Sequence, residues 1–155
     1  MCKLCWAISF ILFLAVAALG YTFIIKGETV AGSDGRAVIV MPEGERDLVL
    51  SEMRAFLAAV QGIINASNED DMEAVAKHAK GVGFAAQQAV PASLMKKLPL
   101  EFKKLGMGTH KAFDQLALDA ADLGDKGHTM QQLGELMQSC VACHAAYRID
   151  PEVPR

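Results

Sequence analysis

The chain contains 155 residues, of which 52% are hydrophobic and 21% are charged. This balance excludes a disordered or a collagen-like chain and leaves room for one folded domain with an appendage. The formal net charge is −3 and the isoelectric point is about 5.8, so we expect no nucleic-acid partner. Four cysteines are too few for a disulfide scaffold, and they lie in two sequence pairs, Cys2 with Cys5 and Cys140 with Cys143.

The N-terminal segment is long and apolar enough to cross a membrane. Residues 4–25 carry no charge and would span about 33 Å as a helix, against a hydrocarbon core of about 30 Å. Lys3 precedes this run and Lys26 ends it, while Trp6 and Tyr21 lie near its two ends, where such rings prefer the interface. The sequence therefore predicts an N-terminal transmembrane helix.

Two interpretations of residues 1–26 remain open. The segment is either an uncleaved membrane anchor or a signal peptide that is cleaved after the small residues at 18–20. The length of the apolar run, which continues to Ile25, favours the anchor. Both interpretations send the rest of the chain across the membrane.

Residues 27–44 are predicted to be a linker. Glycine and proline recur in this segment and interrupt any long regular element, although residues 37–41 could make a short extended piece. As a flexible tether the linker would span about 24 Å. The domain that follows would therefore stay near the membrane if the anchor is retained.

Residues 45–150 show the apolar spacing of three and four residues that is typical of amphipathic helices. Four stripes with this spacing are Leu50–Ile64, Met72–Ala86, Phe102–Leu123 and Met130–Tyr147. Ser67 and Asp70 fit a capping box before the second stripe. The prediction is an all-α fold, an antiparallel up-down-up-down four-helix bundle, with residues 151–155 as a C-terminal tail.

The last stripe contains the motif Cys140-Val141-Ala142-Cys143-His144, which is the C-x-x-C-H signature of covalent haem attachment. On a helix the two thiols lie close together and His144 lies one turn after Cys140, so one haem could take both thiols and the imidazole. His144 falls on the apolar stripe, so we expect it to point into the bundle. The alternatives are a redox or disulfide C-x-x-C and a zinc site, but the α/β pattern and the additional ligands that these need are missing.

A helical domain that ends in C-V-A-C-H-A-A-Y-R resembles the cytochrome c′ family over residues 45–150. Tyr147 and Arg148 match the aromatic-Arg pair that follows the motif in that family. The resemblance implies one covalently bound haem c with iron, held by Cys140, Cys143 and His144, and an Arg148 that pairs with the haem propionates. It also places the domain in the periplasm, with the N-terminus in the cytoplasm.

The resemblance leaves two branches, which differ in the sixth iron ligand. Members proper have five-coordinate iron, and their low-spin relatives use a methionine from the first helix. Met53 lies on the inward stripe near the start of the first helix, so it is the expected ligand, with a plain core methionine as the other interpretation. Met95, His78 and His110 are competing candidates.

Five lysines surround the connection between the second and third stripes and could form a basic rim for an acidic redox partner or a solvated loop. They are Lys96, Lys97, Lys103, Lys104 and Lys111. The expected function is electron transfer at the periplasmic face of a bacterial inner membrane, to a redox protein or a membrane electron-transfer complex, with no substrate turnover. The alternatives are a gas-binding cytochrome c′, a haem subunit of a larger membrane complex, and a soluble periplasmic form if the N-terminal segment is cleaved. The resemblance also suggests a homodimer.

Overall fold

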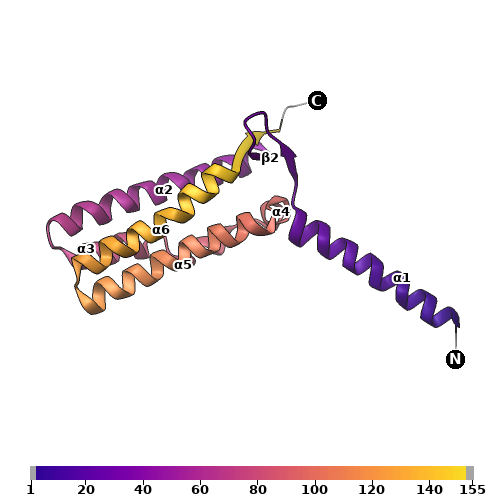
Figure 1. Cartoon of the computed structure of the whole chain (residues 1–155), viewed down its shortest axis with the longest axis horizontal. Coiled ribbons are helices and arrows are strands. Elements are labelled where there is room, and N and C mark those ends of the chain that lie inside the picture. The colour runs from indigo at the N-terminus through magenta and orange to yellow at the C-terminus, as the bar shows by residue number, and fades with distance from the viewer. Residues whose placement is uncertain (1–2, 153–155) are drawn as a thin grey trace.

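The computed structural model describes residues 3–152, apart from the side chains at 23, 88 and 89. The chain begins with the α-helix α1 (Lys3–Gly20), which continues directly into the π-helical turn η1 (Tyr21–Lys26). The apolar helix projects away from the rest of the molecule (Figure 1). Its most hydrophobic stretch of 18 residues has a mean hydropathy of 2.5, and none of that stretch is buried. Its length and composition fit either an anchor or a signal sequence.

The domain that follows is mostly helical, as predicted. Its long helices are α2 (Glu43–Asn68), α3 (Met72–Lys80), α5 (Leu100–Leu123) and α6 (Lys126–Ala146). The helix α3 packs against both α2 and α5, and α6 packs chiefly against α5, with less extensive contact to α2 (Figure 1). The apolar stripes of these four helices therefore cover one another.

The larger hydrophobic core lies between these four helices. Ile63 of α2, Val75 of α3 and Phe113 of α5 are fully buried in it, together with Leu133 of α6. Phe113 also stacks on Phe56, with ring centroids 5.4 Å apart. Each such side chain contributes about 1.5–3 kcal/mol when it leaves water, so the helical packing rests on this core.

Two aspartates fix the starts of helices. The Asp71 carboxylate accepts a hydrogen bond from the backbone N–H of Ala74 at 2.9 Å and caps α3, and Asp125 accepts one from His128 at 3.0 Å and caps α6. The predicted capping box at Ser67 is wrong, because α2 continues past this residue and buries it. The cap is supplied four residues later instead.

The second predicted helix is shorter than its apolar stripe. It ends at Lys80 and is followed by the 3₁₀ helix η2 (Phe84–Ala89) and the short helix α4 (Ala92–Lys97). The carbonyl oxygens of Val82 and Gly83 lie 2.8 and 3.2 Å from Nδ1 of His110, so these groups bond to a side chain of α5 instead of continuing α3. A tertiary contact thus ends the helix earlier than the periodicity predicts.

A small sheet adds to the predicted all-α fold. Its strands are β1 (Thr29–Ala31), β2 (Ala37–Met41) and β3 (Tyr147–Pro151), in the order β1-β2-β3. The first pair is antiparallel, and β2 runs parallel to β3 with Ile39 opposite Ile149. The interpretation of residues 27–44 as a flexible tether is therefore wrong for the strands, because their backbone groups are paired with one another and with the C-terminal segment.

We call the sheet, α4 and residues 140–146 the motif end of the domain. A second core cluster lies here, formed by Ile39 and Met41 of β2, Val49 of α2, and Leu94 and Leu98. At the opposite, far end, the turns between helices meet, and Lys126 Nζ lies 3.3 Å from Asp70 Oδ1. The two ends are thus built from different elements.

Candidate haem-attachment site

The last two turns of α6 position the three motif side chains. Cys140 and Cys143 are both half-buried, and Cys140 packs against the larger core, whereas the side chain of His144 is exposed. The expectation that His144 points into the bundle is therefore wrong for this structure. At this end of α6 it is Tyr147, at the start of β3, that packs on the motif-end core.

Neither motif thiol is in a disulfide in the described part of the chain. Burial raises the pKa of Cys140 and of Cys143, and for Cys143 the neighbouring Cys140 adds to the rise. Both thiols are thus held in the protonated form at neutral pH. Redox and nucleophilic cysteines have lowered pKa values, so this environment is not that of a disulfide-exchange site.

The face of α6 that carries the motif is apolar and open to water. Met137 is 42% exposed and Val141 is 68% exposed, and both lie on the same side of the helix as His144. This face carries two thiols and one imidazole beside apolar side chains. Such a combination fits a flat, largely apolar group with a metal at its centre. The residues present therefore fit a covalently attached haem.

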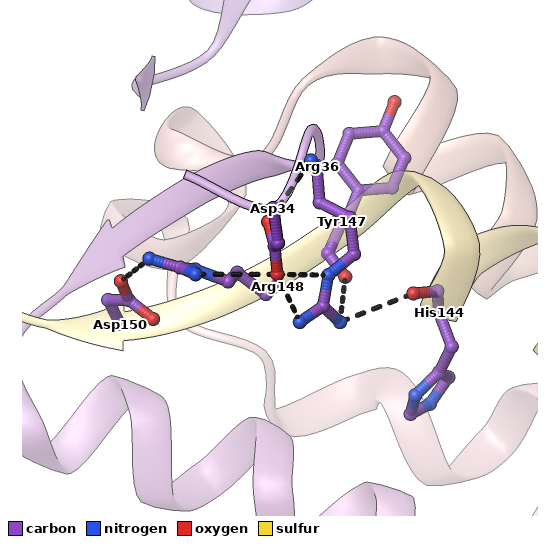
Figure 2. A network of polar contacts seen from close by, with 6 residues as sticks. All are labelled: Asp34, Arg36, His144, Tyr147, Arg148 and Asp150. Atoms are coloured by element: carbon purple, nitrogen blue, oxygen red, sulfur yellow. Dashed lines mark hydrogen bonds and ion pairs between the residues drawn. The ribbon is translucent and has the colours of Figure 1, made fainter. Parts of the chain in front are cut away.

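Arg36 connects the β1–β2 hairpin to the motif (Figure 2). Its Nη1 donates to the carbonyl oxygens of His144 at 3.3 Å and Tyr147 at 3.5 Å. Asp34 orients the guanidinium, with Oδ2 2.7 Å from Nη2 and 2.9 Å from Nε of Arg36. The His144 ring points away from Arg36 in Figure 2, so this contact holds the backbone of His144 and leaves its imidazole free for a ligand role.

Arg148 extends the same network along β3. Its guanidinium lies 3.4 Å from Asp34 and 2.9 Å from Asp150, and the hydrogen bond that it donates to Asp150 raises the pKa of Arg148. The hydrogen bonds from Arg36 lower the pKa of Asp34 to about 2. The guanidinium of Arg148, predicted to meet propionates, is paired with two carboxylates here.

Sequence reasoning missed Arg36 and Asp34, although a signal for them exists. Asp34 and Gly35 form an Asp-Gly pair between two apolar segments, which is a strong short-range indicator of a β-hairpin. Gly35 has φ +84°, the left-handed conformation that such a turn requires. Predicting a β-hairpin at residues 29–41 would have placed Asp34 and Arg36 together in its turn.

Met53 and Met95 both pack on the same hydrophobic cluster, at the motif end. Both are partly buried and pack against the motif-end core, which Tyr147 of β3 also contacts. Met53 touches the larger core as well, so it lies where the two clusters meet. The structure therefore keeps both methionines as candidates near the motif end.

The two competing histidines have different surroundings. His110 is 1% exposed, and its Nε2 lies 3.1 Å from Glu52 Oε1. Burial lowers the pKa of His110, but the hydrogen bonds to Glu52 and to the carbonyls of Val82 and Gly83 outweigh this, so the net pKa is raised. His78 is exposed on α3. A buried and fully hydrogen-bonded His110 is poorly placed to become an iron ligand.

Four of the five predicted lysines lie on α4 and at the start of α5, at the motif end, whereas Lys111 lies in the middle of α5, with its Nζ 5.9 Å from the centroid of the Phe84 ring. Lys97 lies 3.2 Å from Glu45 and 3.3 Å from Glu152, and Lys104 lies 2.8 Å from Glu101. The charges of Lys97 and Lys104 are thus paired within the domain.

Among the described residues, no three His, Cys, Asp or Glu side chains gather as a metal-binding group. Residues 95–148 match the family model described as Cytochrome C′, and this segment contains the complete motif. Searches of curated proteins and of solved structures gave no significant match. The match supports the resemblance to cytochromes c′ over α5, α6 and the start of β3.

Proposed function

We propose that this protein is a single-haem c-type cytochrome that carries electrons at the periplasmic face of a bacterial inner membrane. The observation that carries the proposal is the C-x-x-C-H motif on an open apolar helix face, inside the segment that matches the cytochrome c′ model. When bound, the haem supplies an iron that takes up and releases one electron. In this role the protein turns over no substrate.

Each motif residue then has a defined task. The thiols of Cys140 and Cys143 would hold the haem covalently through its two vinyl groups. The imidazole of His144 would bind the iron, and Arg36 holds the His144 backbone through a hydrogen bond of 3.3 Å. For Arg148 to pair with a propionate, that propionate would displace Asp34 or Asp150 from the guanidinium.

We propose Met53 as the sixth ligand. Its thioether comes from α2, and the side chain lies between the two core clusters at the motif end. The side chain of His144 is exposed in this structure, so it would have to turn toward the bundle for both residues to bind one iron. A thioether ligand raises the reduction potential and closes the iron to gases. We further propose that α2, α3, α5 and α6 form the antiparallel up-down-up-down bundle of the low-spin relatives of cytochrome c′.

An absorption spectrum of the purified holoprotein, oxidised and reduced, with and without carbon monoxide, tests this proposal. We expect a low-spin spectrum with a methionine-to-iron band that carbon monoxide does not change. The Met53→Ala variant should become high-spin, whereas the matched Met95→Ala variant should keep the wild-type spectrum. If only Met95→Ala changes the spin state, the ligand is Met95.

A different spectrum would favour the other function. High-spin iron that shifts on addition of carbon monoxide would identify a gas-binding cytochrome c′, in which Met53 covers an open coordination position. Co-purification of stable subunits with the intact chain would instead favour a haem subunit of a larger membrane complex. The expected partner of the electron carrier is a redox protein or such a complex, and gel filtration will show whether the protein is a homodimer.

A further inference from the structure

The passage from the apolar helix to the domain is short and tightly packed. Only Gly27 and Glu28 separate Lys26, the last residue of η1, from Thr29, the first residue of β1. The N–H of Glu28 donates to the carbonyl of Lys97 at 2.7 Å. No flexible tether thus lies between the helix and the first strand.

Gly27 is the residue that allows this close packing. Its φ is +61°, and an added Cβ would lie 2.5 Å from both the carbonyl oxygen of Lys97 and the nitrogen of Pro99. Any larger residue would meet both a strained backbone conformation and a clash with the α4–α5 connection. The buried glycine therefore seats the end of η1 on this connection.

The same connection is fixed to the rest of the motif end. Lys97 pairs with Glu45 at the start of α2 and with Glu152 after β3, and its side chain is 15% exposed. Close by on α5, Lys103 Nζ lies 3.5 Å from the carbonyl oxygen of Ile24 in η1. These contacts tie the end of the apolar helix to both chain ends of the domain.

The packing continues to the haem motif. Phe102, next to Lys103, meets Tyr147 edge to face, with ring centroids 5.4 Å apart, and Tyr147 follows His144 by three residues. Figure 1 shows α1 leaving the domain from the same end at which β2, α4 and the end of α6 lie. A membrane that holds α1 would therefore lie next to the motif end.

We propose that residues 24–31 form a rigid joint, which keeps the apolar helix attached to the mature domain and presents the motif end to the membrane surface. A short stiff connection restricts the domain to one orientation, whereas a flexible tether would let it tumble. The inference rests on the proposed function only in naming the motif as the haem site. In this orientation, the residues that would hold the haem lie beside a membrane-bound electron-transfer partner.

The orientation is measured on the full-length holoprotein in lipid nanodiscs. Spin labels are placed at Lys104→Cys, at the motif end, and at Asp122→Cys, at the far end, in a Cys2→Ser and Cys5→Ser background. Lipids that carry a chelated nickel ion increase the relaxation rate of a nearby spin label. The relaxation rate of each label is measured with and without these lipids, and the difference excludes the constant contribution of the haem iron. We expect several-fold stronger relaxation at position 104 than at 122.

A matched variant tests the joint itself. A flexible Gly/Ser insert of about ten residues, which spans roughly 17 Å, is placed between Lys26 and Gly27, so that Gly27 keeps its contacts. We expect the difference between the two labels to collapse while the absorption spectrum stays unchanged. The inference is overturned if the native labels relax equally, if the insert leaves their difference intact, or if mass spectrometry shows that the purified protein has been cleaved after residues 18–20 and lacks the apolar helix. Failure of the proposed ligand set would appear in the spectrum alone.

Discussion

The helical core and the motif end of this domain are held together by different forces. In the helical core, the larger of the two clusters, helices cover one another with fully buried side chains such as Ile63, Val75 and Phe113. At the motif end, strand pairing and the charged network of Arg36 and Arg148 supplement a smaller apolar cluster. Burial of apolar surface contributes much free energy but is not directional, whereas exposed ion pairs orient groups and add little stability. The helical core therefore contributes most of the stability, and the motif end fixes the geometry around the motif.

The largest expected effect comes from removing a side chain of the helical core. The Phe113→Ala variant should lower the free energy of unfolding by about 3–5 kcal/mol, because it removes a fully buried ring and leaves a cavity beside Phe56. Chemical denaturation followed by circular dichroism measures the loss. The control is Leu118→Ala on the same helix, which is 58% exposed and should cost less than about 0.5 kcal/mol. Equal losses would contradict the assignment of the core.

A truncation in the motif-end core should have a more local effect. Ile39 is fully buried between Thr29 and Ile149 in the sheet, so Ile39→Ala should cost about 2–5 kcal/mol within this region. Hydrogen exchange should show faster exchange in β1, β2 and β3 and unchanged protection in α5. If protection fell equally in all elements, the two regions would be one cooperative unit and the comparison would fail.

The same contrast explains what could be predicted from the sequence. The helices α5 and α6 follow from local apolar spacing, because each stripe is contained within one segment and needs only a covering surface. The sheet could not be predicted in this way, since β2 pairs with residues more than a hundred positions away, as in Ile39 with Ile149. The Asp34-Gly35 turn carried a local signal for the hairpin, but no local signal for its parallel partner.

The candidate site likewise contains residues that a local motif marks and residues that only the fold brings to it. Spacing alone identified Cys140, Cys143 and His144, because covalent attachment needs those residues in one helical turn. Arg36 reaches His144 only through the fold of the hairpin, so no motif marks it. The choice between Met53 and Met95 depends on side-chain packing at the meeting point of two clusters, which periodicity does not resolve.

A third effect, of intermediate size, involves buried His110 and its half-buried partner Glu52. The pKa of His110 is raised in the folded protein, so folding binds this proton more tightly than the unfolded chain does. Stabilisation is thus complete below the ordinary value of 6.5 and is lost as the pH rises through the raised folded pKa. The free energy of unfolding of the Glu52→Gln variant should be lower by about 1–2 kcal/mol near pH 6, and it should decline less steeply than that of the wild type as the pH rises further. Denaturation midpoints across this pH range test the sign, and a decline as steep as that of the wild type would contradict the pairing.

The smallest expected loss of stability comes from the network beside the motif. Arg36 is 35% exposed at its side chain, so Arg36→Gln should cost less than about 1 kcal/mol. The change removes the donor to the carbonyls of His144 and Tyr147, so amide exchange at the end of α6 should become faster. The control is Arg46→Gln, whose ion pair with Asp47 lies within α2 and should leave that exchange unchanged.

Asp34 provides a second measure of the same contact. Its folded pKa of about 2 lies below the ordinary value of 3.8, so its stabilisation is present above pH 3.8 and is lost as the pH falls through about 2. In Arg36→Gln the main cause of this shift is removed, and the Asp34 pKa should return toward 3.8, as an NMR titration of its carboxyl would show. An unshifted Asp34 pKa in this variant would mean that Arg148 alone holds the carboxylate. Arg36 would then support the His144 backbone without being oriented by Asp34.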